Sequence, residues 1–291
     1  MTDFLQLLLS GLATGSIYAL AALGFTLLWQ ASGTINFAQG EFVMLPAFAM
    51  LACMSFGAPL GIAFVLTVLL AVVVLGWGFK RGVVDPLLRF GMMPIVVATI
   101  GLSIAMRNGV RAGFSAEAHP FPSLFADKIF NVAGVTVTLA DIGTFALAVA
   151  IVLATQAFLS RTVTGRAMQA VAQNTESAQV LGIDVPRMVF YTFAINATLA
   201  VAAALLVTPT YLAKFDMGEG LGTKAFFAAI IGGFNNSRGA LVGGLIVGVA
   251  ENLAAAYISP AYKDAVALLI FMLVILFKPQ GLLGRKEERK V

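Results

Sequence analysis

Carboxylate and amide side chains that could contact a polar solute are rare in the apolar parts of this chain. A charged or amide group at membrane depth costs about 3 kcal/mol and usually faces a protein interior or a pathway. Such groups occur at residues 36–41, at residue 196 and at residues 251–252. We expect six of them to line a solute pathway or its gate: Asn36, Gln39, Glu41, Asn196, Glu251 and Asn252.

A structural interpretation of these groups stays open beside the pathway interpretation. Gly33, Asn36 and Gly40 share one face if their segment is helical, and the helix dipole favours Glu41 in a first turn. This segment is then either a capped helix end or a broken backbone near the pathway. Glu251 needs a partner or a proton. Its role is either an interhelical hydrogen bond or a group on the pathway.

Glycines four residues apart mark the faces on which helices can pack closely. Small residues at this spacing let two helix backbones approach each other. Residues 11–15 contain one such pair and residues 239–248 contain two, and Glu251 continues the face of the last pair. The predicted packing residues are Gly11, Gly15, Gly239, Gly243, Gly244 and Gly248.

Sequence motifs that bind nucleotides or build catalytic centres are absent. The chain has no G-x-x-x-x-G-K-[ST] loop, no H-E-x-x-H pair and no G-x-S-x-G elbow. Its one histidine, His119, and its one cysteine, Cys53, form no metal-binding pattern. We therefore expect no enzymatic activity, no cofactor and no metal. Work done by this chain must draw on a partner subunit or an ion gradient.

Composition indicates that these residues belong to a membrane protein. Hydrophobic residues make up 60% of the 291 and charged residues 11%, whereas a soluble domain is about one quarter charged. A spanning helix needs about 20 apolar residues, and the apolar runs are too continuous for barrel strands. We predict an all-α, polytopic integral membrane protein with about 8–10 transmembrane or re-entrant helices in one domain, residues 1–291. The predicted helices cover residues 5–29, 37–56, 60–79, 92–110, 139–159, 188–212, 240–258 and 262–277, with a short re-entrant or broken piece at 223–231.

The placement of lysine and arginine predicts which helix ends face the cytoplasm, where loops carry an excess of both. If nine segments cross the membrane, 12 of the 18 basic residues fall on one side. That side includes residues 160–187 and the basic tail, residues 278–291. We expect both in the cytoplasm. Nine crossings would place the N-terminus outside, and eight or ten would place it inside. Arg107 and Arg111 fall near an outer helix end, where we expect them either to anchor the helix or to contact a protein that delivers the solute.

Residues 160–187 form the longest polar interruption among the apolar runs. Charged and amide residues alternate there with alanines and leucines at amphipathic spacing. A segment of this length and pattern predicts a cytoplasmic docking surface, and an ordinary solvated loop is the alternative. The residues expected to carry the docking are Arg166, Gln173, Asn174, Glu176, Ala178 and Gly182.

Several motifs resemble one transport family. The pattern E-S-A-x3-G at residues 176–182 resembles the E-A-A-x3-G loop by which permease subunits of bacterial ATP-binding-cassette (ABC) importers dock onto their ATPase, with Ser177 in place of an alanine. Residues 164–174, 15–20, 35–41 and 232–244 look like the matching parts of LivH-type permeases of branched-chain amino acid importers. Gln39 stands where that family often has histidine.

The resemblance implies the rest of the assembly. Two cytoplasmic ABC ATPases, a second permease subunit (identical or a paralogue) and a periplasmic binding protein would act with this chain in the bacterial inner membrane, with lipid around it and no nucleic acid. A single helix over residues 167–181 would enter an ATPase groove, with Arg166 and Glu176 setting its register. The implied solutes are branched-chain or other hydrophobic amino acids, and urea, short amides or another small organic solute are alternatives. A different class, a gradient-driven secondary transporter or channel with Glu41 or Glu251 as coupling carboxylate, stays open.

Overall fold

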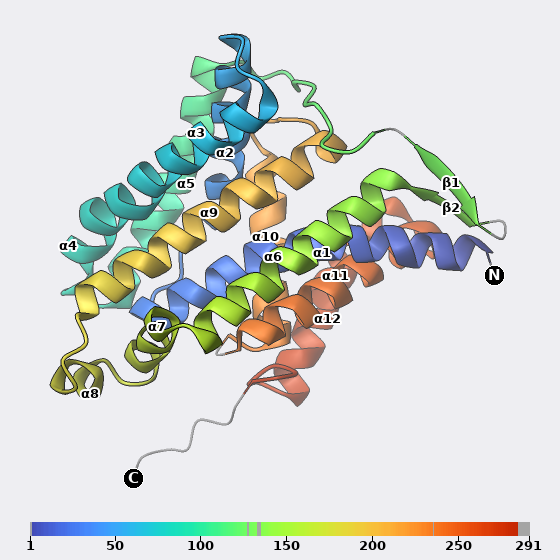
Figure 1. Cartoon of the computed structure of the whole chain (residues 1–291). Coiled ribbons are helices and arrows are strands. Elements are labelled where there is room, and N and C mark those ends of the chain that lie inside the picture. The colour runs from blue at the N-terminus through green and yellow to red at the C-terminus, as the bar shows by residue number, and fades with distance from the viewer. Residues whose placement is uncertain (1, 127, 133–134, 235, 285–291) are drawn as a thin grey trace. The chain divides into compact units, whose positions relative to one another are not determined.

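The computed structural model describes residues 2–126, 128–132, 135–234 and 236–284 (Figure 1). Helices dominate this part of the chain. Their bounds are α1 (Thr2–Ser32), α2 (Gln39–Ser55), α3 (Leu60–Ala71), α4 (Asp85–Leu88), α5 (Met92–Gly113), α6 (Leu139–Arg161), α7 (Val163–Gln173), α8 (Thr175–Val180), α9 (Val185–Tyr211), α10 (Met217–Gly232), α11 (Ser237–Tyr257) and α12 (Lys263–Phe277). Wide π-helical turns, Val72–Gly78 and Lys80–Val84, join α3 to α4, and a 3₁₀ turn, Pro260–Tyr262, precedes α12.

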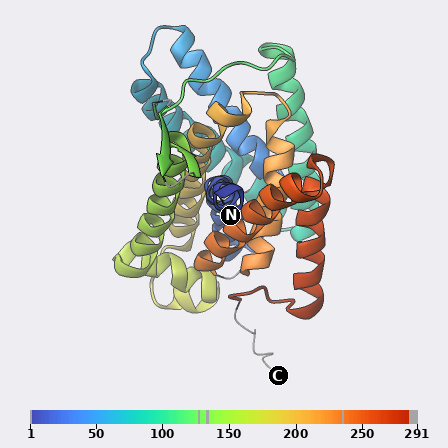
Figure 2. The same cartoon turned by 90° about the vertical axis from the view of Figure 1, so that its right-hand side faces the viewer.

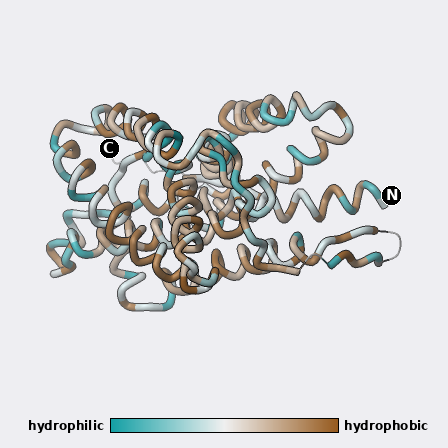
Figure 3. Tube along the Cα trace, turned by 90° about the horizontal axis from the view of Figure 1, so that it is seen from above, coloured by the Kyte–Doolittle hydropathy of each residue, from teal (hydrophilic) through white to brown (hydrophobic). Residues whose placement is uncertain are grey.

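Seven of the described helical stretches are long and apolar enough to cross a membrane. They are Thr2–Ser32, Leu60–Leu88, Met92–Gly113, Leu139–Arg161, Val185–Tyr211, Ser237–Tyr257 and Pro260–Phe277. The apolar helix α2, with 17 residues, is shorter. Apolar residues prevail along the helices (Figure 3), and α12 buries only Ala267. Lipid tails can cover such an exposed apolar face, so the predicted all-α, polytopic membrane class is confirmed.

One helix of the structure extends beyond the apolar run from which it was predicted. The piece predicted at residues 223–231 is part of α10, which has 16 residues and begins at Met217. Glu219 lies in its first turn, where the helix dipole favours a carboxylate. Helix hydrogen bonds are local and do not require apolar side chains, so the polar residues before 223 extend the helix.

The chain divides into two compact units, each assembled from separate sequence segments. The first contains residues 1–26, 125–153 and 224–291, and the second contains residues 27–124 and 154–223. The chain passes from one unit to the other within α1, α6 and α10 and in the loop after α5. The predicted tail residues Arg285, Lys286, Arg289 and Lys290 lie outside the described residues.

In the first unit, helices pack through small and aromatic residues. The helices α11 and α12 lie side by side (Figure 2), and Phe227 of α10 stacks on Phe271 of α12 with ring centroids 4.6 Å apart. Before α6 the chain forms an antiparallel hairpin of β1 (Ile129–Val132) and β2 (Val135–Thr138), with Ile129 opposite Thr138. The sequence shows the alternation of β2 but gives no sign of its partner.

In the second unit, α9 is the central helix. It lies against α2, α3, α7 and the π-helical turn after α3 (Figure 1). Every residue from Leu199 to Thr208 of α9 is buried. The ring of Phe79 packs against the rings of Phe42 and Phe193, with centroid distances of 5.0 Å and 6.0 Å. This aromatic cluster joins α2 and α9. This packing holds α2, α7 and α9 in one body.

Candidate functional site

The predicted single helix over residues 167–181 is wrong, because Asn174 divides it into α7 and α8. The backbone of Asn174 is extended, with φ −158° and ψ 105°, and its Oδ1 accepts a hydrogen bond of 2.8 Å from the N–H of Ser177. An asparagine in this position is a favoured N-cap. Thr162 caps α7 in the same way, accepting from the N–H of Gly165 at 3.0 Å. The side chains of Thr162 and Asn174 therefore set the direction of both short helices.

Gly182 ends α8 in a left-handed conformation, with φ +80°. Its N–H donates to the carbonyl of Gln179, and the N–H of Ile183 donates to the carbonyl of Ala178, both at 3.0 Å. This hydrogen-bond pattern is a Schellman motif, for which glycine is preferred at the left-handed position. Asp184 then caps α9 by accepting from the N–H of Arg187 at 3.1 Å. The turn from α8 into α9 is fixed by backbone geometry.

The segment presents one buried face and one exposed face. Its described buried residues are Gly165, Met168, Val171 and Ala178. Two apolar side chains at the end of α8 face outward: Val180 is 88% exposed and Leu181 is 78% exposed. The predicted docking residues on the exposed surface are Arg166, Gln173, Asn174, Glu176 and Gly182. An exposed apolar pair beside charged residues is typical of a protein-binding surface.

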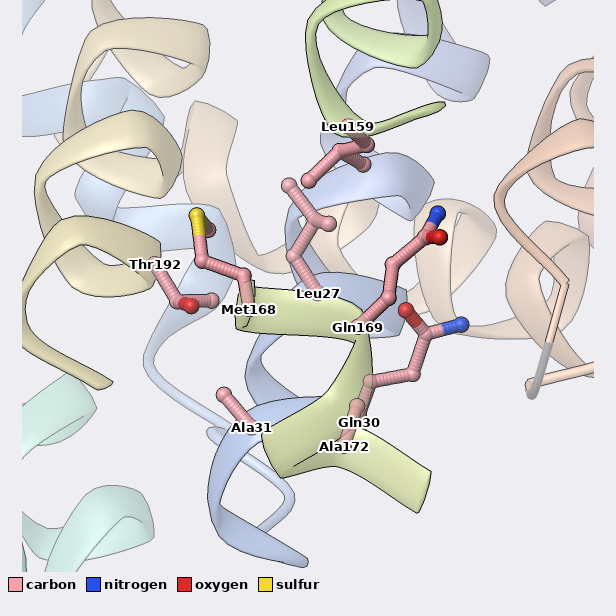
Figure 4. A pocket seen from close by; sticks show the side chains of 8 residues that line it. All are labelled: Leu27, Gln30, Ala31, Leu159, Met168, Gln169, Ala172 and Thr192. Atoms are coloured by element: carbon pink, nitrogen blue, oxygen red, sulfur yellow. The ribbon is translucent and has the colours of Figure 1, made fainter. Parts of the chain in front are cut away.

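The buried face of α7 rests on the end of α1 and lines a small cleft of the second unit (Figure 4). Met168 and its neighbours from α7 lie opposite the last turns of α1, and Leu159 of α6 and Thr192 of α9 complete the wall. Around this cleft α7 therefore adjoins three longer helices, α1, α6 and α9. The residues lining the cleft are Leu27, Gln30, Ala31, Leu159, Met168, Gln169, Ala172 and Thr192.

The polar segment at residues 33–41 is a bend followed by a helix start. The shared helical face predicted for Gly33, Asn36 and Gly40 is therefore wrong. The helix α1 ends at Ser32, and Gly33 has φ +61°. Asn36 Oδ1 accepts from the N–H of Ala38 at 3.0 Å, which shapes the turn before α2 begins. A glycine in the left-handed region stops a helix, so the backbone is broken between α1 and α2.

Two of the predicted pathway residues form a buried pair. Gln39 of α2 and Asn196 of α9 are each 1% exposed. Gln39 Nε2 donates to Asn196 Oδ1 at 2.8 Å, and Asn196 Nδ2 donates to Gln39 Oε1 at 3.1 Å. Each amide thereby satisfies the other where water is excluded. The pair locks the first turn of α2 to α9.

A polar stripe on α5 faces the start of α2. Thr99 Oγ1 accepts from the N–H of Phe37 at 3.2 Å. One and two turns further along α5, Ser103 and Arg107 lie close enough to act on the buried Glu41 carboxylate, as does the acidic Glu219 of α10. Arg107 is also ion-paired with Glu219. The fold thus collects one guanidinium and two carboxylates, Glu41, Arg107 and Glu219.

The first turns of α2 and α10 cross almost backbone to backbone. A side chain on Gly40 would overlap the carbonyl of Gly218, and its Cβ would also lie 3.1 Å from Gly222 Cα. Three glycines at one crossing let the helices approach closely. This contact places Glu41 and Glu219, which follow Gly40 and Gly218 in sequence, at the same point.

Glu251 of α11 is fully buried in the first unit and has three partners. Its Oε2 accepts from the hydroxyl of Tyr18 at 2.8 Å, and its Oε1 accepts from Lys224 Nζ at 2.5 Å. Lys263 Nζ lies 3.5 Å from the same oxygen. Lys224 also pairs with Asp264 at 3.1 Å. The network therefore joins α1, α10, α11 and α12.

The glycines of α11 pack against two different helices, α10 and α1. Gly239 and Gly243 pack on α10, where a Cβ at either position would overlap the carbonyl of Gly232 or Ala228. Gly244 and Gly248 pack on α1, where Gly11 and Gly15 lie in the same crossing. Asn252 lies beside them, with its amide donating to the Gly248 carbonyl at 3.0 Å.

The predicted pathway residues therefore fall into two groups. Asn36, Gln39, Glu41 and Asn196 belong to the second unit, whereas Glu251 and Asn252 belong to the first. Four charged residues near the predicted carboxylates were missed as site residues: Arg107, Glu219, Lys224 and Lys263. Their sequence positions gave one signal, since each is a charged residue within or beside an apolar run. The sequence could not indicate their partners, because these lie far away along the chain.

A family model and two known proteins of the same transport family match nearly the whole chain. A family model described as "Branched-chain amino acid transport system / permease component" matches residues 7–275. The high-affinity branched-chain amino acid transport system permease protein BraD of Pseudomonas aeruginosa is 34% identical over 303 residues, covering 99% of this chain and 98% of BraD. The corresponding permease protein LivH of Escherichia coli is 35% identical over 302 residues, with the same coverage.

One solved structure is similar in fold. A chain of PsaBC from Streptococcus pneumoniae in complex with Fab aligns with a TM-score of 0.50 at 12% identity. The alignment covers 95% of this chain and 92% of that one. At this identity the likeness concerns the fold alone.

Proposed function

Because this chain belongs to the branched-chain amino acid transport system permease family, we propose that it forms the membrane pathway of an ABC importer together with a second permease subunit. The solute is a branched-chain or similar hydrophobic amino acid, as in the names of BraD and LivH. A periplasmic binding protein delivers it, and the chain resides in the bacterial inner membrane. Two separate cytoplasmic ATPase subunits hydrolyse ATP, and this chain is not itself an enzyme.

The observation that carries this proposal is the capped pair α7–α8. Its exposed face offers Val180 and Leu181 beside Glu176, and its buried face rests on the end of α1. An ATPase that binds the outer face moves the inner face with it, because the caps at Thr162, Asn174 and Gly182 hold the segment rigid. This is the segment in which the E-S-A-x3-G pattern occurs, and the remaining helices supply the pathway.

The pathway follows from the polar residues of the second unit. We assign Asn36 and Glu41 to its inner surface, because a buried polar group in an apolar bundle is costly unless it serves a neighbour or a solute. Gln39 and Asn196 satisfy each other, and we assign them to holding α2 against α9 beside this surface. Glu251 and Asn252 have satisfied partners in the first unit. We assign them to holding that unit together.

Coexpression with the ATPase and binding-protein subunits tests this function. We expect the ATPases to copurify with the chain, and leucine uptake into vesicles to require ATP and the binding protein. Uptake should persist after ionophores collapse the ion gradients. Uptake that follows an ion gradient and ignores ATP would instead identify a secondary transporter and exclude the importer.

Replacement of Gly182 tests the docking segment. Valine in a left-handed conformation costs about 1–2 kcal/mol, which corresponds to a loss of about 5–30-fold in an equilibrium constant. We expect Gly182→Val to weaken copurification of the ATPase by about this factor, measured by titrating the purified subunits against each other.

The matched control for this change is Gly182→Asn. Asparagine tolerates the left-handed region, and no other atom lies within 4 Å of a Cβ at this position. The asparagine variant should therefore bind the ATPase nearly as well as the unchanged protein. Equal binding by both variants would show that the turn after α8 does not position the docking surface.

A further inference from the structure

The crossing of α2 and α10 brings two carboxyl groups, Glu41 and Glu219, close to Arg107 of α5. Arg107 is ion-paired with Glu219, whereas Glu41 forms no ion pair with any residue that the structure describes. Glu41 is 2% exposed. A buried carboxylate is stabilised by a cation or hydrogen-bond donors. The site as it stands can accept one further positive group.

Arg107 also has an unused donor. Among the residues that the structure describes, its buried Nε has no hydrogen-bond partner. A buried donor without a partner is costly, and such donors occur at functional sites. Arg107 can therefore bind a second acceptor beyond Glu219.

The two carboxylates differ in exposure. Glu41 is held in the first turn of α2 beside Ser103, whereas the side chain of Glu219 is 62% exposed. An exposed ion pair is weak, since water competes for both charges. Glu219 can thus leave Arg107 at small cost and return afterwards, while Glu41 stays in place.

A free α-amino acid carries both charges that this site lacks. We propose that Glu41 and Arg107 form a transient binding site for the zwitterionic head group of the transported amino acid. Arg107 binds the α-carboxylate in place of Glu219, and Glu41 accepts the α-ammonium group. Planar guanidinium and carboxylate groups match in bidentate geometry. The inference rests on the proposed importer function and adds the chemistry by which the pathway itself recognises its solute.

The proposed site would give the pathway a selectivity that an apolar passage lacks. Urea and short amides carry no formal charge, so they cannot replace Glu219 on Arg107 or balance Glu41. The apolar side chain of the amino acid needs no matching polar group. The path then selects for the head group, and the side chain is left for the binding protein to distinguish.

The test uses the assembled importer in proteoliposomes with the binding protein and radiolabelled leucine. We expect Glu41→Gln and Arg107→Gln each to lower ATP-driven leucine uptake at least about tenfold, the effect of losing one charge-assisted hydrogen bond. ATPase stimulation by the binding protein should be retained. The matched control is Arg111→Gln, one turn along α5, where the guanidinium lies 5.4 Å from the ring of Phe215.

Charge reversal separates substrate binding from a structural ion pair. The double variant Arg107→Glu/Glu219→Arg should assemble normally and still fail to take up leucine. If a glutamine variant does not assemble, Glu41→Asp and Arg107→Lys keep each charge and shorten or reshape its reach, and uptake should fall in an intact complex.

The outcomes distinguish the two proposals. Leucine uptake at the unchanged level in either glutamine variant, in the assembled aspartate or lysine variant, or in the reversed pair would overturn the binding site. An unchanged importer that shows no ATP-dependent uptake and no ATPase association would instead overturn the importer function. Uptake lost together with ATPase stimulation would assign Arg107 and Glu41 to assembly and would also overturn the binding site.

Discussion

Replacing Gly40 with valine is expected to abolish solute uptake and to lower the melting temperature of the purified protein by about 5–10 °C. A Cβ at Gly40 overlaps the Gly218 carbonyl and lies 3.1 Å from Gly222 Cα. Both neighbours are backbone atoms, so no change of rotamer can relieve the overlap and α2 must move from α10. Overpacking of this kind costs about 1–3 kcal/mol or more, and each kcal/mol lowers the melting temperature by about 2–4 °C.

Gly61→Val is the matched control for this prediction. Gly61 is the second residue of α3, as Gly40 is of α2, and no other atom lies within 4 Å of a Cβ placed there. The loss of helix-terminal glycine is therefore the same in both variants, and only the close crossing differs. A Gly40→Val protein that melts and transports like the Gly61→Val protein would show that α2 and α10 do not meet at these glycines.

Replacing Glu251 with leucine is expected to destabilise the protein by about 3–5 kcal/mol, because it leaves a largely buried lysine without its main partner. Of its carboxylate partners Lys224 would keep Asp264, whose side chain is 83% exposed, and the Tyr18 hydroxyl would lose its acceptor. The expected result is a melting temperature about 10 °C lower or more, measured in detergent, with poor recovery of folded protein.

Removing the opposite charge should reverse most of this loss. Replacing both members of a buried ion pair with apolar groups of similar volume is often neutral or stabilising. The double variant Lys224→Met/Glu251→Leu should therefore melt well above Glu251→Leu alone. A double variant as unstable as the single one would mean that the pair is not coupled. In that case the cost would come from lost packing or from the Tyr18 hydrogen bond.

Most of the fold class could be predicted from local composition. Apolar runs of sufficient length predicted the long helices within a few residues at most ends, since a spanning helix satisfies its own backbone and lipid accepts any apolar side chain. The prediction failed where a single side chain decides the backbone. Asn174 was predicted inside a helix and instead caps α8, because its amide competes with the helix for a backbone N–H.

In the candidate site, too, the sequence indicated individual residues but not their partners. That Glu251 needs a partner followed from its burial cost, but its partners Lys224 and Tyr18 belong to other helices. The sequence shows no arginine beside a carboxylate at membrane depth that would indicate an amino acid site. Such a group exists because Gly40 lets α10 approach α2, which brings Glu219 to Arg107 and Glu41.

The sequence by itself determined the membrane class, the transport family and the position of the polar segment at residues 160–187 for which docking is proposed, because each depends on residue types within one short window. Only the tertiary structure decided which helices the glycines join, how the docking segment turns, and which charges meet. Those contacts link residues as far apart as Tyr18 and Glu251. Their energies depend on burial and on distances of a few ångströms, which no local pattern contains.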